Sequence, residues 1–369
     1  MNLNDYEDKY ENFDIPLMYV KVSGRRIEDE DLAYTDLYVE TTMGIEASLC
    51  RFTIVARNTL CTDDGKLKVS SSLKGKFNLG NEISVYIGYN DDSKLKQIFD
   101  GYITSINFEY TGREEVSYTI ESMDLKVFMM NNFRSELKKD MKRYSDVVSD
   151  ILKNYSSLYK SKKIDRTQEI ETFIEQHNQS DYDFIVFMAR KIDYKFFVIN
   201  GEVKFIDYTK LKGSILTVSP GKYLYSFERE ISLNKQLKKV VVRTNSEKNP
   251  NKSIEGSAVS VTTVGKGRRS GSEITKLING TMQRTIIDNS VKSESQAKSR
   301  AQAELNRMSM DLVSGVCKIV GIPELEPGKF ITVKNIDSDI DSDYLITGVE
   351  HIFNYEGYKT ICKFGANKV

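Results

Sequence analysis

The sequence predicts a mainly β fold in which two antiparallel β modules flank a small α+β insert. Apolar and polar residues alternate from about Leu17 to Glu121 and again from Leu216 onward, as in strands with one buried face. Between these regions the apolar spacing becomes helical. The predicted domains are an N-terminal arm at 1–14, a first β domain at 15–133, the α+β domain at 134–212 and a second β domain at 213–369.

An internal repeat links the two β domains. In each copy a glycine opens an alternating strand, a second strand follows a polar loop, and a hairpin closes the unit. The first copy comprises Gly80–Val85, Tyr102–Ile106 and a turn at 110–112, and the second comprises Gly328–Val333, Leu345–Val349 and a turn at 355–357. Chance similarity is the alternative, since any antiparallel sheet is rich in Val, Ile and Thr. A true repeat presents two equivalent surfaces, which is typical of ring-forming proteins.

Local signals place the elements of each domain. In the first β domain, alternation predicts strands around Cys50–Ile54 and at 80–89, 99–110 and 116–120. In the α+β domain, Ser145 and Ser180 are expected to cap helices, and Asp183 completes a capping box with Ser180. Asn200-Gly201 between two alternating runs predicts a hairpin, because both turn residues need positive φ.

Two interruptions are expected in the second β domain. Residues 245–272 are polar and rich in Gly, Ser and Lys, which indicates a long loop or flap. Residues 292–309 are expected to form a helix whose small inward residues let it lie close to a sheet.

Composition restricts the classes of partner. Acidic and basic residues number 53 each, so no net field favours nucleic acid or an anionic membrane, and sequence-specific nucleic-acid binding is not expected. No apolar run approaches a membrane span, and the acidic N-terminus differs from a secretory signal. We expect synthesis in a reducing cytoplasm, with Cys50, Cys61, Cys317 and Cys362 as free thiols.

Catalytic motifs are sparse, and we expect no enzyme activity, cofactor or metal site. His177 and His351 lie in different predicted domains, where structural roles are favoured. The alternating aspartates at 337–343 suggest calcium, but Ser342 and Gly348 replace the Gly and Glu of an EF-hand loop. A basic loop without phosphate-loop spacing remains as the candidate partner contact, with residues Lys252, Lys266, Arg268 and Arg269.

Two other functions stay open from the residues alone. A cell-wall hydrolase would need a carboxylate pair in a cleft, and acidic residues are plentiful. A carbohydrate-binding adhesin would need exposed aromatics in a groove, for which Tyr208, Tyr223 and Tyr225 are candidates.

Several ordered motifs resemble the phage late control D and VgrG-type baseplate hub family. The motifs are Ile87-Gly-Tyr89, Ile98–Ile103, Glu121–Asp124, Gln176–Phe184, Met188–Phe197, Pro323–Gly328 and Tyr344–His351. The resemblance covers about residues 35–365. It implies a homotrimer with two tube-like β-barrel modules per chain, forming a pseudo-sixfold ring between a hexameric tail tube and a threefold spike.

The resemblance also implies the partners and place of the protein. These are the tail tube protein, other baseplate proteins and a spike or tip protein, in a phage tail, tail-like bacteriocin or related injection system. The chain ends at Val369, just past the second module, so we expect the spike to be separate, including one that degrades cell wall. The arm at 1–14 and the loop at 245–272 lack clear family counterparts and are candidates for partner-specific contacts.

Overall fold

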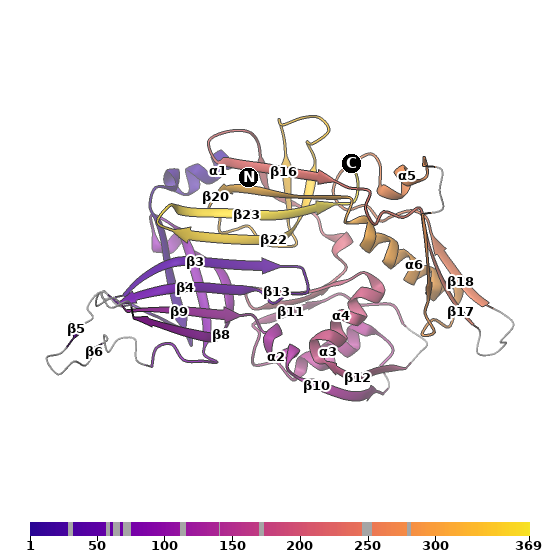
Figure 1. The fold of residues 1–369 in the computed structure, drawn as a ribbon, viewed down its shortest axis with the longest axis horizontal. Helices are drawn as coiled ribbons and strands as arrows, with labels where there is room; N and C mark the ends of the chain where they lie inside the picture. Colours follow the sequence, from indigo (N-terminus) through magenta and orange to yellow (C-terminus); the bar gives the residue numbers. More distant parts are fainter. Residues whose placement is uncertain are drawn as a thin grey trace.

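The computed structural model describes residues 1–28, 32–56, 60–61, 67–68, 75–110, 116–139, 141–169, 173–245, 253–278 and 282–369. More of these residues belong to β-strands than to helices (Figure 1), so the mainly β class is confirmed. The largest element is a 13-stranded sheet that contains strands from both ends of the chain.

The first module supplies six long strands to this sheet. Its strands are β1 (Pro16–Val22), β3 (Leu32–Thr42), β4 (Leu49–Ala56), β7 (Glu82–Tyr89), β8 (Lys96–Tyr110) and β9 (Val116–Met123). They pair in the order β3-β4-β9-β8-β7-β1, every pair antiparallel. The short strands are β2 (Arg25–Arg26), which pairs with β1, and β5 (Leu60–Cys61) and β6 (Leu67–Lys68), which pair with each other.

The second module repeats this order. Its strands are β15 (Ser214–Val218), β16 (Leu224–Ile231), β20 (Val313–Val320), β21 (Phe330–Val333), β22 (Asp343–Asn354) and β23 (Gly357–Ala366). They pair as β16-β20-β23-β22-β21-β15, so that β16 corresponds to β3 and β22 to β8. One difference is that β15 runs parallel to β21, whereas β1 runs antiparallel to β7.

The repeat extends to individual hydrogen bonds. Gly80 and Gly328 both have positive φ (82° and 87°), and their main-chain N–H groups donate to corresponding carbonyls, of Ile103 at 2.8 Å and Ile346 at 2.9 Å. The strand that follows each glycine carries a hydroxyl that donates to an aspartate on the next strand. These bonds are Ser84 Oγ to Asp100 Oδ2, at 2.7 Å, and Thr332 Oγ1 to Asp343 Oδ1, at 2.6 Å. Register breaks also fall at corresponding places, between Ile103 and Ser105 and between Ile346 and Gly348. Chance similarity does not produce this agreement.

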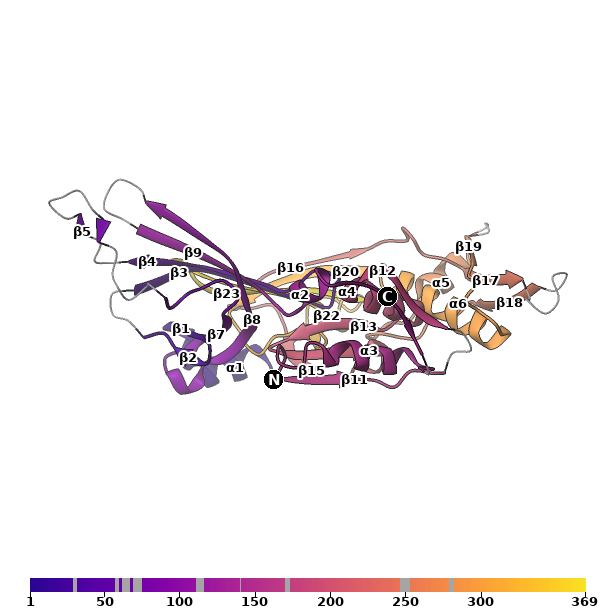
Figure 2. The same ribbon diagram turned by 90° about the horizontal axis from the view of Figure 1, so that it is seen from below.

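The two modules are joined edge to edge inside the chain. Strand β3 pairs with β22 over residues 37–42 and 348–353, so the modules form one sheet rather than two separate ones. Side chains on one face of this sheet form the main core, whereas the alternate residues remain partly exposed. Figure 2 shows α1, β1, β7 and β15 on the side of the buried face. We call the opposite, partly exposed face the wet face.

The N-terminal arm packs into this core. It contains α1 (Leu3–Lys9) and the 3-10 turn η1 (Glu11–Phe13). Tyr6, Tyr10 and Phe13 are buried, and Phe13 contacts the rings of Tyr89 from the first module and Tyr223 from the second. The arm therefore holds the two modules together, and its proposed contact with a partner stays a prediction for its exposed residues.

The α+β domain lies beside the joined modules. Its elements are α2 (Lys126–Met130), β10 (Phe133–Lys138), α3 (Tyr144–Lys153), β11 (Ser161–Ile164), β12 (Ile174–Ser180), α4 (Asp181–Ile192), β13 (Lys195–Ile199), β14 (Glu202–Ile206) and η3 (Tyr208–Lys210). The predicted helix cap at Ser180 and the predicted turn at Asn200-Gly201 are confirmed, whereas the Asp183 carboxylate accepts the Ser180 hydroxyl at 2.7 Å instead of completing a capping box. Ser180 Oγ accepts the N–H of Asp183 at 3.0 Å, and Asn200 and Gly201 have φ values of 50° and 80°. Ser145, in contrast, lies inside α3, which begins at Tyr144 after Arg143.

An insertion between β16 and β20 forms a further small unit. It contains β17 (Lys239–Asn245), β18 (Ser253–Ala258), α5 (Gly271–Thr275), β19 (Gln283–Ile287) and α6 (Glu294–Ser309). Part of the expected loop at 245–272 is therefore strand β18, which pairs with β17 and lies under α6. Gly256 permits this packing, because a Cβ there would lie 2.2 Å from the main-chain nitrogen of Lys298. The predicted helix at 292–309 is present as α6.

Candidate assembly edges and an interdomain pocket

The sheet ends on one side in an unpaired strand. Strand β16 pairs only with β20 among the described strands, which leaves its other edge open. Ile231 is 52 % exposed there, and Tyr225 is 48 % exposed. An edge of this length with exposed apolar side chains is suited to pairing with another strand.

A second open edge lies in the first module. Residues 96–102 of β8 pair with β7, whereas residues 105–110 pair with β9 alone in the part of the chain that the structure describes. Phe108 and Tyr110 are 49 % and 46 % exposed on this half-strand. The corresponding half of β22 is the one that pairs with β3.

The pairing of β3 with β22, which we call the internal joint, shows how such edges meet. On its buried side, Leu37, Val39 and His351 are almost completely inaccessible. On its wet side, Glu40 lies directly opposite Glu350, and Lys363 Nζ bridges them at 2.8 and 2.7 Å. Partial burial lowers the pKa of Lys363, but its hydrogen bonds to Glu350 and Glu40 outweigh this and raise the pKa. The lysine thus offsets repulsion between two opposed carboxylates.

The predicted basic loop lies beside the C-terminal residues that come after β23. Lys252 lies outside the described residues. Lys266 Nζ pairs with Asp343 Oδ2 at 2.7 Å, and the N–H groups of Arg268 and Arg269 donate to the Val369 carbonyl at 2.7 and 2.8 Å. Lys266 pairs with Asp343 of the second module as Lys160 pairs with Asp100 of the first, so the Lys266 ammonium group has an ion-pair partner within its own chain. The two arginine side chains are exposed, so the contact role of this loop stays a prediction.

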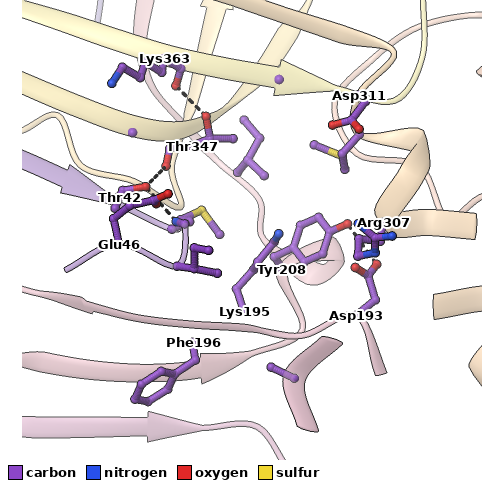
Figure 3. Close-up of a pocket in the computed structure, with 18 of the residues that line it drawn as sticks. Thr42, Glu46, Asp193, Lys195, Phe196, Tyr208, Arg307, Asp311, Thr347 and Lys363 are labelled. Atoms are coloured by element: carbon purple, nitrogen blue, oxygen red, sulfur yellow. Dashed lines mark hydrogen bonds between the residues drawn. The ribbon is translucent and has the colours of Figure 1, made fainter. Parts of the chain in front are cut away.

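A pocket lies between the α+β domain, α6 and the module joint (Figure 3). Its volume is about 710 Å³. Figure 3 shows Asp193, Lys195, Tyr208 and Arg307 close together on one side of it. Asp193 ends α4 in a left-handed conformation (φ 58°), and its Oδ2 accepts the Tyr208 hydroxyl at 3.0 Å.

Burial sets the electrostatics of this pocket. Burial raises the pKa of Asp193 to about 7, although Lys195 and the Tyr208 hydrogen bond lower it in part. Burial also lowers the pKa of Lys195, against the opposite effect of Asp193. The cluster therefore contains a carboxyl that gains or loses its proton near neutral pH. The sequence motifs did not reveal it, because the residues come from the end of α4, β13, η3 and α6.

The other candidates of the sequence have structural surroundings. His351 is buried, its Nδ1 lies 2.7 Å from the Tyr358 hydroxyl, and burial lowers its pKa to about 4. The Asp341 carboxylate accepts main-chain N–H groups of its own loop, and no cluster suited to a metal occurs among the described residues. Tyr208 and Tyr223 are buried, which leaves Tyr225 as the exposed member of the proposed sugar-binding aromatics.

The cysteines that the structure describes with side chains, Cys50, Cys317 and Cys362, are buried free thiols. His177, the second histidine, lies exposed on β12. No helix in the described ranges is long and apolar enough to cross a membrane.

The fold is similar to that of phage tail proteins. A tail protein from Neisseria meningitidis MC58 matches with a TM-score of 0.68 and 11% identity, covering 95% of this chain and 97% of the other. The 43 kDa tail protein of prophage MuSo2 from Shewanella oneidensis matches with a TM-score of 0.68 and 12% identity, covering 95% and 98%. A component of the type VI secretion system of E. coli matches with a TM-score of 0.57 and 10% identity, covering 94% and 76%.

A family model adds a sequence-level relationship. The model described as the Alg8 N-terminal domain matches residues 17–354, so the chain belongs to that family. A search of curated proteins found no match.

Proposed function

We propose that this chain is a structural baseplate hub of a contractile phage tail, a tail-like bacteriocin or a related injection system. The observation that carries the proposal is the duplicated module, with the same strand order, the same register break and the same Ser/Thr–Asp bond in both copies. The fold similarity to tail proteins and to a secretion-system component supports the same reading.

The duplication supports a homotrimer. Three chains with two similar modules each supply six similar faces around a threefold axis. Such a ring would adapt a hexameric tail tube on one side to a threefold spike on the other. In this arrangement the α+β domain and the insertion, which occur once per chain, would contact other baseplate proteins.

The function is one of binding and symmetry matching, not catalysis. In the pocket the Tyr208 hydroxyl donates to Asp193, and strand pairing with apolar contact needs no reactive group. The partners are the tail tube protein, other baseplate proteins and a separate spike or tip protein. The chain would be made in the bacterial cytoplasm and assembled into the particle there.

Mass measurement and negative-stain imaging of the purified protein test this function. We expect a trimer that appears as an annulus with a central hole. Because some assemblies form only with their neighbours, the measurement is repeated with the tail tube and spike proteins present. A chain that stays monomeric under both conditions would contradict the proposal.

A further inference from the structure

We propose that copies of this chain join through β16 of one copy and residues 105–110 of β8 in the next, in the register that β3 and β22 use inside the chain. This proposal rests on the proposed ring and names the surface that closes it. Both strands have an open edge among the described strands, and each corresponds to one member of the internal joint. The internal joint therefore serves as the template for the joint between copies.

The register follows from the strand pairings. The register break that both modules share places Ser105 of β8 at the position of Gly348 in β22. Following the paired residues from β8 through β9 and β4 to β3, and from β22 through β23 and β20 to β16, places Glu230 at the position of Glu40. Since Glu350 lies opposite Glu40, Asn107 lies opposite Glu230. The remaining pairs are Ser105 with Ser232, Ile106 with Ile231, Phe108 with Arg229, Glu109 with Glu228 and Tyr110 with Phe227.

Side-chain directions agree with this register. Ile106, Phe108 and Tyr110 lie on the face of β8 that continues the buried side of the sheet, as do Phe227 and Ile231 on β16. The joint would therefore cover the apolar residues that are half exposed in a single chain. A shift of this register by one residue would turn the apolar side chains of one strand to the partly exposed face of the sheet.

The wet side of this joint differs from its template. Glu121 occupies the position of Lys363, so no lysine stands beside Asn107 and Glu230. Glu109 also lies directly opposite Glu228, and like charges opposite one another destabilise a strand pair. The joint between copies is thus opposed by the pair Glu109–Glu228, at a place where the internal joint has Ile352 opposite Tyr38, and added salt should strengthen it by screening.

Charge reversal tests the register. Glu109→Lys and Glu228→Lys should each lower the concentration of half-association by about fivefold or more, because each creates an opposite-charge pair. The double variant places two lysines opposite each other and should lose this gain. Glu175→Lys, the same change on an exposed position of β12, should leave association unchanged. Analytical ultracentrifugation at low and high salt measures all four.

Cross-linking provides a second measurement. Cysteines in place of Asn107 and Glu230 should form a disulfide between copies, since directly opposite Cβ atoms lie about 4.5–5.5 Å apart. Cysteines in place of Asn107 and Glu228 would be diagonal neighbours and should link poorly. If a trimer forms but the single charge reversals bring no gain and the first cysteine pair does not link, this proposal is wrong while the proposed function stands. A chain that stays monomeric with its partners overturns both.

Discussion

Replacement of Asp193 by Asn should stabilise the protein at alkaline pH and much less at acidic pH. Asp193 is 5 % exposed, and burial raises its pKa from 3.8 to about 7. The folded chain therefore holds this proton more tightly than the unfolded chain. The penalty for ionising the carboxyl is absent below about pH 4, grows as the pH rises toward 7, and is constant above that.

The size of the effect follows from the two pKa values. One unit corresponds to about 1.36 kcal/mol, so the penalty grows by about 2.5 kcal/mol between pH 5 and pH 8. Asn carries no charge, tolerates the left-handed backbone and can accept the Tyr208 hydrogen bond. The attraction between the ionised Asp193 carboxylate and Lys195 is already contained in the pKa of about 7, so its loss in the variant does not change the expected difference.

Urea unfolding of both proteins at pH 5 and pH 8 measures this difference. The stability of the Asn variant relative to the parent should rise by about 2.5 kcal/mol between the two conditions. Asp36→Asn is the matched control, because Asp36 is exposed and also has positive φ (51°), so it reports any gain from the backbone alone. A relative stability that stays constant within about 0.5 kcal/mol would mean that Asp193 does not titrate in this range.

Three further substitutions test the packing. Gly256→Ala puts a Cβ 2.2 Å from the main chain of α6 and should cost about 3 kcal/mol or release the insertion to proteolysis, whereas Gly348→Ala, with no atom closer than 3.5 Å, should be tolerated. Phe13→Ala should lower the urea midpoint by an amount equivalent to about 3–5 kcal/mol, and an unchanged midpoint would show that the arm does not hold the modules together. Lys363→Met should cost about 1 kcal/mol, and adding Glu40→Gln should recover most of it in a double-mutant cycle.

Features set by neighbouring residues could be predicted from the sequence. The turn at Asn200-Gly201 and the cap at Ser180 were identified because the backbone conformation depends on those residues themselves. The repeat was found because Gly80 and Gly328 are needed at the same positive-φ position.

Features set by distant residues could not be predicted in this way. The pairing of β3 with β22 leaves no local pattern, since the partners lie far apart in the chain. Strand β18 was predicted as loop because Ser253–Ala258 has few strand-forming residues, and α6 supplies the cover that stabilises it. The pocket around Asp193 likewise forms only when the α+β domain and the insertion meet.

Each module departs from the repeat at a different turn. In the first module the connection from β4 to β7 is long (residues 57–81), whereas the corresponding connection from β20 to β21 in the second module is short (residues 321–329). In the second module the connection from β16 to β20 is long (residues 232–312), whereas the corresponding connection from β3 to β4 is short (residues 43–48). Because β3 and β4 run in opposite directions, these two departures fall at opposite ends of the strands. In the ring proposed above, image averaging with sixfold symmetry imposed would blur both departures, whereas averaging with threefold symmetry would retain them.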